Sequence, residues 1–164
     1  MLEFKKVLTQ KDTELTAELA KEIWNQHFVP LIGQGQVDYM LEHFQSESAM
    51  AKQIESGYEY YQFMLDKTAI GYFAICPEED NTLFLSKLYL KQEYRGRGYA
   101  RQAFEYIKDI ATSNGNTMVW LTVNKHNDNT ISVYKKFGMK IIRSQVTDIG
   151  NGYVMDDYVF GYEL

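Results

Sequence analysis

The hydrophobic residues near the beginning of the chain are spaced as on one face of a helix. Leu15, Leu19 and Ile23 lie four residues apart, and this spacing predicts a helix that ends at Pro30. A second helical pattern follows and is interrupted at residues 46–48. We therefore expect a pair of helices whose second member is split.

From Tyr58 onward the pattern changes to the alternation of strands, and strands and helices then follow one another to the end of the chain. The predicted strands span residues 4–8, 59–65, 69–76, 82–90, 118–123, 139–146 and 153–162, and the predicted helices span residues 13–28, 37–56, 100–111 and 130–137. This order predicts one α/β (α+β) layer fold, with residues 1–164 as a single domain and no linker or repeat.

The composition limits the partners and the compartment. Apolar residues make up 45% of the 164 residues and charged residues 24%, which is enough apolar content for one self-sufficient core. The net charge of −5 argues against a nucleic-acid surface and favours a cationic partner. No stretch is long and apolar enough for a signal peptide or a membrane span, so the sequence predicts a soluble, cytoplasmic protein.

Cysteine and histidine are sparse. Cys76 is the single cysteine, which excludes an internal disulfide, and it ends an apolar run in which burial is expected. His27, His43 and His126 are scattered along the chain, so the spacing of a zinc site is absent and no metal is expected.

Residues 94–100 read YRGRGYA and stand between a predicted strand and a predicted helix. The N–H groups at a helix start attract anions, and glycines let a phosphate approach the backbone. From this stretch alone two interpretations remain open: a phosphate or pyrophosphate site, or a tight turn with solvated arginines. A dinucleotide fingerprint is excluded because Arg101 stands in place of its third glycine, and a P-loop is excluded because Tyr-Ala follows Gly98.

Two segments of the chain resemble the signatures of one family. Residues 95–100, Arg-Gly-Arg-Gly-Tyr-Ala, resemble the signature with which GNAT-family N-acetyltransferases hold the pyrophosphate of acetyl-CoA. Asn127, Tyr134 and Gly138 resemble the second signature of that family, and the two signatures occur in the family's order with one strand between them. The resemblance is sharp over residues 70–139.

The resemblance implies a fold, a cofactor and a set of site residues. The sheet would be mixed and mostly antiparallel, with about seven strands and about four flanking helices, and would splay between residues 82–90 and 118–123. Acetyl-CoA would be the cosubstrate, and a main-chain N–H of the first of these strands would polarise its thioester carbonyl, a contact worth roughly 2.7 to 4 kcal/mol. Tyr134 would protonate the leaving sulfur. The cofactor-binding residues implied by the resemblance are Leu88, Tyr89, Leu90, Arg95, Gly96, Arg97, Gly98, Tyr99, Ala100, Asn127 and Tyr134.

The proton acceptor and the acetyl acceptor remain open at this point. Many family members carry a Glu on the strand before the phosphate loop, but residues 85–88 contain none. Glu59, Asp156, Asp157 and a water relay through Tyr or Ser hydroxyls are the alternatives for the base. The acceptor would be a small-molecule or peptide amine, with a cationic one favoured by the charge. The residues considered for its pocket are Trp24, His27, Phe28, Tyr39, His43 and Tyr60.

Three functions are compatible with these features. The first is an N-acetyltransferase that moves an acetyl group from acetyl-CoA to a primary amine by direct attack in a ternary complex. The second is a GNAT-fold module that binds or senses acyl-CoA with little turnover, and the third is an unrelated α/β domain with an accidental Gly-Arg-Gly turn. The sequence leaves the oligomeric state open, with a homodimer as one option.

Overall fold

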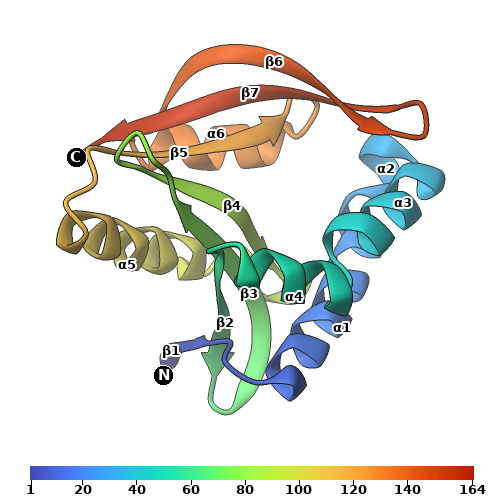
Figure 1. The fold of residues 1–164 in the computed structure, drawn as a ribbon, viewed down its shortest axis with the longest axis horizontal. Helices are drawn as coiled ribbons and strands as arrows, with labels where there is room; N and C mark the ends of the chain where they lie inside the picture. Colours follow the sequence, from blue (N-terminus) through green and yellow to red (C-terminus); the bar gives the residue numbers. More distant parts are fainter. The chain divides into compact units, whose positions relative to one another are not determined.

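Seven strands form one mixed sheet in the computed structural model, which describes residues 1–164 (Figure 1). The elements are β1 (Leu2–Lys6), α1 (Gln10–His27), α2 (Val29–Ile32), α3 (Gln34–Phe44), α4 (Glu47–Glu55), β2 (Glu59–Leu65), β3 (Thr68–Pro77), β4 (Thr82–Leu90), the 3-10 helix η1 (Gln92–Tyr94), α5 (Tyr99–Ser113), β5 (Met118–Asn124), α6 (Asp128–Lys136), β6 (Lys140–Gly150) and β7 (Tyr153–Glu163). The strand order is β1-β2-β3-β4-β5-β7-β6.

The sheet confirms the predicted fold class. Antiparallel ladders join β1 to β2, β2 to β3, β5 to β7 and β6 to β7, whereas β4 and β5 are parallel. The parallel ladder covers only residues 82–84 of β4 and 118–120 of β5, although both strands continue beyond it. This short ladder agrees with the predicted splay between the two strands.

The helices differ from the prediction at their ends and in number. There are six α-helices rather than about four, because α3 and α4 are separate and α2 is an additional turn. Pro30 does not end the first helix: α1 ends at His27, and Pro30 lies in the first turn of α2, where a missing N–H is tolerated. The α1 helix begins before the predicted residue 13 because Thr9 and Asp12 form a capping box.

The chain divides into two compact units that both include part of β4. Unit 1 contains residues 1–76 and 87–103, and unit 2 contains residues 77–86 and 104–164. Within unit 1, α1 lies against α3 and α4 (Figure 1). Its core includes Leu19 and Ile23 of the predicted helix face, whereas Leu15 of that face is 42% exposed. The strand side chains Tyr72 and Phe73 have no exposed area, and Cys76 is buried as predicted.

Unit 2 packs α5 and α6 with aromatic side chains. The Phe104 ring of α5 stacks on Phe137 with a centroid distance of 5.3 Å and meets Tyr162 of β7 edge-on at 5.6 Å. The β6–β7 hairpin turns at Asn151 and Gly152, both with positive φ, as expected for this dipeptide. The chain has no helix of sufficient length and apolarity to traverse a lipid bilayer.

Candidate active site

The predicted phosphate loop connects η1 to α5 within unit 1. Gly96 and Gly98 have φ angles of +74° and +83°, a conformation that favours glycine. A Cβ on either residue would meet no atom within 4 Å, so the loop is open on that side. The first α-helical hydrogen bond runs from the N–H of Gln102 to the carbonyl of Gly98, and the N–H groups before it have no partner within the helix.

These features fit an anionic group. The loop and the first turn of a 15-residue helix present main-chain N–H groups where the helix dipole is positive. The open side of the two glycines is where a phosphate would approach. Arg97 and Arg101 are exposed and add positive charge near the loop.

Arg95 has a different role from the other arginines of the loop. Its Nε donates to the carbonyl oxygen of Leu90 at 3.2 Å, and its Nη1 donates to Nδ1 of His27 at 2.9 Å. Burial lowers the pKa of Arg95 below its ordinary value. Arg95 therefore fastens the loop to the end of β4 and to the last turn of α1.

The end of β4 approaches β3 unusually closely at Gly71. A Cβ on Gly71 would lie 2.3 Å from the carbonyl oxygen of Tyr89 and 2.9 Å from a methyl carbon of Leu90. Only glycine fits there, because the contact is with main-chain atoms. Gly71 thus sets the position of the backbone at Leu88–Leu90, the segment predicted to pair with the cofactor.

Lys87 is a buried cation that the sequence did not mark as special. It is 6% exposed, and its ammonium group donates to the carbonyl oxygen of Phe44 at 2.6 Å, to Oε1 of Gln53 at 3.0 Å and to the hydroxyl of Tyr60. Burial lowers the pKa of Lys87 to about 7. All three ammonium donors have acceptors, so Lys87 ties β4 to β2, α4 and the end of α3. The sequence contained one signal for this buried lysine, namely its place at a core-facing position of an otherwise apolar strand.

The second predicted signature lies in unit 2. Asn127 is 6% exposed and precedes α6, where its carbonyl accepts the first helical hydrogen bond from Ile131. Tyr134 is also 6% exposed, and its ring lies 6.0 Å from Phe137 and 6.1 Å from Phe160 between centroids. Burial raises the pKa of the Tyr134 phenol, so the hydroxyl keeps its proton at neutral pH.

The two adjacent aspartates of β7 have different surroundings, as strand alternation predicted. Asp156 forms an ion pair with Lys125 at 3.0 Å. Asp157 is 3% exposed, and its Oδ1 is buried without a hydrogen-bond partner. Burial, and to a smaller extent the charge of Asp156, raise the pKa of Asp157 to about 6, with Lys125 opposing the shift.

Asp157 stands in the middle of a polar row. Its directly paired residues are Asn124 on β5 and Gln145 on β6, and paired residues of antiparallel strands share one face of the sheet. The three side chains therefore form a row across β5, β7 and β6, which we call the polar row. Asn124 uses its Oδ1 to accept from the N–H of His126 at 2.9 Å.

Glu59, the other candidate base, is paired with a cation. Its Oε1 accepts from Lys6 at 2.9 Å across β1 and β2.

The aromatic residues considered for the acceptor pocket all belong to unit 1, and the Phe28 ring contacts Trp24 at 4.2 Å and His27 at 4.7 Å between centroids. Trp24 and Phe28 pack on Tyr89 with centroid distances of 5.5 and 5.7 Å. His27 is bound to Arg95 and Tyr60 to Lys87, as described above, and Tyr39 and His43 contact each other on α3 at 4.2 Å. An acceptor pocket among these residues stays a prediction.

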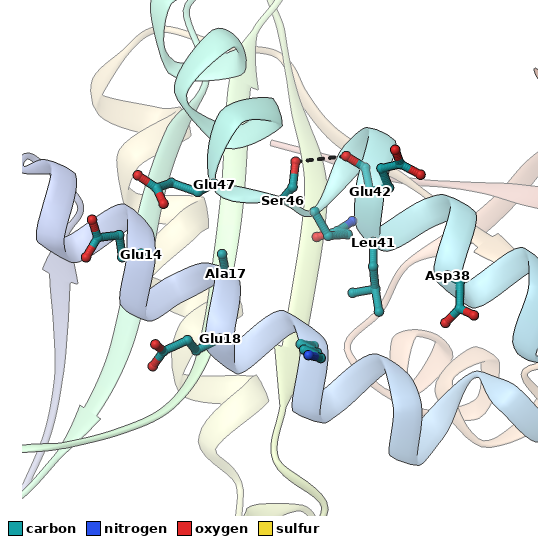
Figure 2. A pocket seen from close by; sticks show the side chains of 10 residues that line it. Glu14, Ala17, Glu18, Asp38, Leu41, Glu42, Ser46 and Glu47 are labelled. Carbon is teal, nitrogen blue, oxygen red and sulfur yellow. Dashed lines mark hydrogen bonds between the residues drawn. The ribbon is translucent and has the colours of Figure 1, made fainter.

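A groove in unit 1 is lined by acidic residues (Figure 2). It has a volume of about 650 Å³ and lies between α1 and the α3–α4 segment. Its lining includes five carboxylates and one lysine, from Glu14, Glu18, Asp38, Glu42, Glu47 and Lys21. None of the residues predicted to bind cofactor lines this groove, so it is separate from the phosphate loop.

Known proteins resemble the chain in sequence and in fold. An uncharacterised N-acetyltransferase of Mycobacterium tuberculosis is 33% identical over 99 residues, and one of Lactobacillus delbrueckii subsp. lactis is 23% identical over 119 residues. The matches cover 60% and 68% of this chain and 63% and 69% of the relatives, so the chain spans less than two thirds of the mycobacterial protein.

The fold matches solved acetyltransferases. The PaiA N-acetyltransferase of Thermoplasma acidophilum, solved in complex with coenzyme A, superposes with a TM-score of 0.83 over 100% of this chain and 99% of that chain, at 21% identity. A GNAT-family acetyltransferase of Elizabethkingia anophelis with acetyl-CoA bound gives a TM-score of 0.61 over 76% and 88%, at 15% identity. The model of the acetyltransferase (GNAT) family matches residues 17–139 of this sequence. The chain therefore belongs to the GNAT acetyltransferase family.

Proposed function

We propose that this protein is an N-acetyltransferase that moves an acetyl group from acetyl-CoA to a primary amine by direct attack. Family membership supports the acetyl transfer, and two relatives of known fold were solved with coenzyme A or acetyl-CoA. The observation that carries the proposal is the open, glycine-lined loop of residues 95–100 at the start of α5. We take residues 1–164 as one catalytic domain, because β4 belongs to both units.

The cofactor would be held mainly by backbone groups. Main-chain N–H groups of residues 95–100 would bind the pyrophosphate, and the backbone of Leu88–Leu90 would pair with the pantetheine arm. Arg95 and Gly71 support this role, because they fix the loop and the strand end on which these groups stand. Asn127 belongs to the same proposed site through its signature.

The transfer needs an activated carbonyl and a protonated leaving group. Bound acetyl-CoA would supply the thioester, and a main-chain N–H at the end of β4 would donate to its carbonyl oxygen. Tyr134 would donate a proton to the sulfur; the raised pKa of the phenol supports an acid that is protonated at neutral pH. No metal is required for these steps.

We infer an amine that carries positive charge, on a small molecule or a peptide. The net charge of −5 and the acidic groove of unit 1 favour the approach of a cation. A module that only binds acyl-CoA is a weaker alternative, since it gives no reason for Tyr134 in the second signature.

A release assay tests the proposal. Purified protein is mixed with acetyl-CoA and, in separate reactions, spermidine, glucosamine or a lysine-containing peptide, and free CoA thiol is measured. We expect thiol release that depends on both the protein and an amine. Tight binding of acetyl-CoA without release for any amine would favour the binding module instead.

A further inference from the structure

The polar row of unit 2 contains a buried carboxylate that the fold itself does not satisfy. Asp157 is 3% exposed, and its Oδ1 is fully buried without a hydrogen bond. A buried charge of this kind destabilises the folded state, because the lost hydration is not replaced. An orphan buried group therefore points to a ligand or to a chemical role.

The neighbours of Asp157 on its face of the sheet do not neutralise its charge. Asn124 and Gln145 flank it on the same face and carry no charge, so they make the row polar without neutralising the carboxylate. Lys125, a cation of the same unit, is held by Asp156 at 3.0 Å. The row thus presents an anionic oxygen between two amides.

The partner that fits this oxygen is a cation with N–H donors. A primary ammonium group has three donors, of which Asp157 can accept one while amide oxygens accept others. The acceptor amine of the proposed reaction arrives as an ammonium ion, because alkyl ammonium groups have a pKa near ~10.4. It must lose a proton before its nitrogen can attack the thioester.

We propose that Asp157 is the catalytic residue that receives the acceptor's ammonium group and takes one of its protons. This inference rests on the proposed amine N-acetyltransferase function and names the base for that reaction. The raised pKa of about 6 supports it, because such a carboxylate is ionised at neutral pH yet is a stronger base than an ordinary aspartate.

The protons and electrons balance as follows. One N–H bond of the ammonium breaks, its electron pair stays on nitrogen, and the proton forms an O–H bond on Asp157. The neutral nitrogen forms a C–N bond with the acetyl carbonyl carbon, and the C–S bond breaks with its electron pair going to sulfur. Sulfur takes the proton of Tyr134, and Tyr134 regains a proton from the new amide nitrogen. Asp157 then releases its proton to water.

The test compares Asp157→Asn with Asp109→Asn as the matched control, because Asp109 is an exposed aspartate of α5 in the same unit. For the amine that gives most thiol release among spermidine, glucosamine and the lysine peptide, we expect Asp157→Asn to lower kcat/KM at least about 100-fold. The affinity for CoA, measured by calorimetry, should stay within about twofold, and the melting temperature should not fall. Asp109→Asn should keep kcat/KM within about threefold of the wild type.

The outcomes separate this inference from the proposed function. Thiol release by the wild type with equal release by Asp157→Asn overturns the role of Asp157 and leaves the transferase assignment intact. No release by the wild type with any amine removes both. If Asp157→Asn does not fold, Asp157→Glu replaces it in the test, because glutamate keeps a carboxylate. Activity of Asp157→Glu above about a tenth of the wild type supports the base role. Complete inactivity of a folded Asp157→Glu with normal CoA affinity contradicts that role.

Discussion

Lys87 of unit 1 and Asp157 of unit 2 are both buried charged side chains, but their hydrogen bonding differs. Lys87 of unit 1 is 6% exposed and has an acceptor for each of its three ammonium donors. Asp157 of unit 2 is 3% exposed and has an oxygen with no donor. A satisfied charge fixes the elements around it, whereas an unsatisfied one remains ready for a ligand. The difference agrees with the two roles that we propose, a structural one for Lys87 and a chemical one for Asp157.

The largest expected effect tests the structural role of Lys87. Lys87→Met should lower the free energy of unfolding by about 3 kcal/mol, because Phe44, Gln53 and Tyr60 lose a buried donor. Urea unfolding measures this. Lys91→Met is the control: Lys91 pairs with Glu22 at 3.3 Å nearer the surface, so its replacement should change the free energy by less than about 1 kcal/mol. An equally stable or more stable Lys87→Met would show that the network is not structural.

The next effect concerns cofactor affinity in unit 1. Gly98→Asp should weaken CoA binding at least about 100-fold, because a left-handed backbone is strained for aspartate and its carboxylate repels phosphate. Calorimetric titration with CoA measures the affinity. Gly115→Asp, at a positive-φ glycine beyond the end of α5, controls for strain alone. Unchanged affinity in Gly98→Asp would remove the phosphate loop from the site.

A smaller effect is expected for the proposed acid of unit 2. Tyr134→Phe should lower kcat about 10- to 100-fold and change CoA affinity less than about threefold, since only a proton donor is removed. Steady-state kinetics with the amine selected above gives both values. Tyr106→Phe, on the exposed side of α5, should behave like the wild type. Equal loss of kcat and affinity would make Tyr134 a binding residue.

The smallest expected effect concerns the contribution of Asp157 to the stability of the folded protein, as distinct from its proposed role as a base. The pKa of Asp157 is raised from 3.8 to about 6, so the folded state favours the protonated form, and stability present at low pH is lost as the pH rises through about 6. Asp157→Asn should therefore gain about 1 kcal/mol over the wild type at pH 7 to 8 and little at pH 4. Denaturant unfolding at the two pH values measures the gain. A loss of stability at pH 8 would mean that Asp157 is a structural partner.

The sequence was sufficient for the parts of the molecule that depend on local pattern. Strand alternation and the glycines of the loop predicted the seven strands and the left-handed turn before α5. The end of the first helix was predicted to within one residue, but the role given to Pro30 was wrong, because Pro30 lies in the first turn of α2. In a sequence, a proline in the first turn of a new helix looks the same as a proline that follows a helix, unless a glycine marks the end of the first helix. Here the residue between α1 and α2 is Phe28.

The sequence could not predict which residues far apart in the chain come together in the fold. Alternation predicted that Asp156 and Asp157 face opposite ways, but which one is buried depends on β7 lying between β5 and β6, an order that does not follow the chain. The partners of Lys87 come from residues 27 to 43 positions away, so no local signal could name them. Gly71 was likewise unremarkable until Tyr89 was placed against it.

The division of β4 between the two units determines which fragments of this protein can fold. The chain crosses between the two units three times, after residues 76, 86 and 103, and each unit is assembled from two separate stretches of chain. No contiguous fragment contains all of one unit without a piece of the other. Expression of either half as a truncated gene product would therefore leave a strand edge or an apolar helix face exposed. Proteolytic dissection should give no stable core smaller than nearly the whole chain, and unfolding should proceed as a single cooperative event.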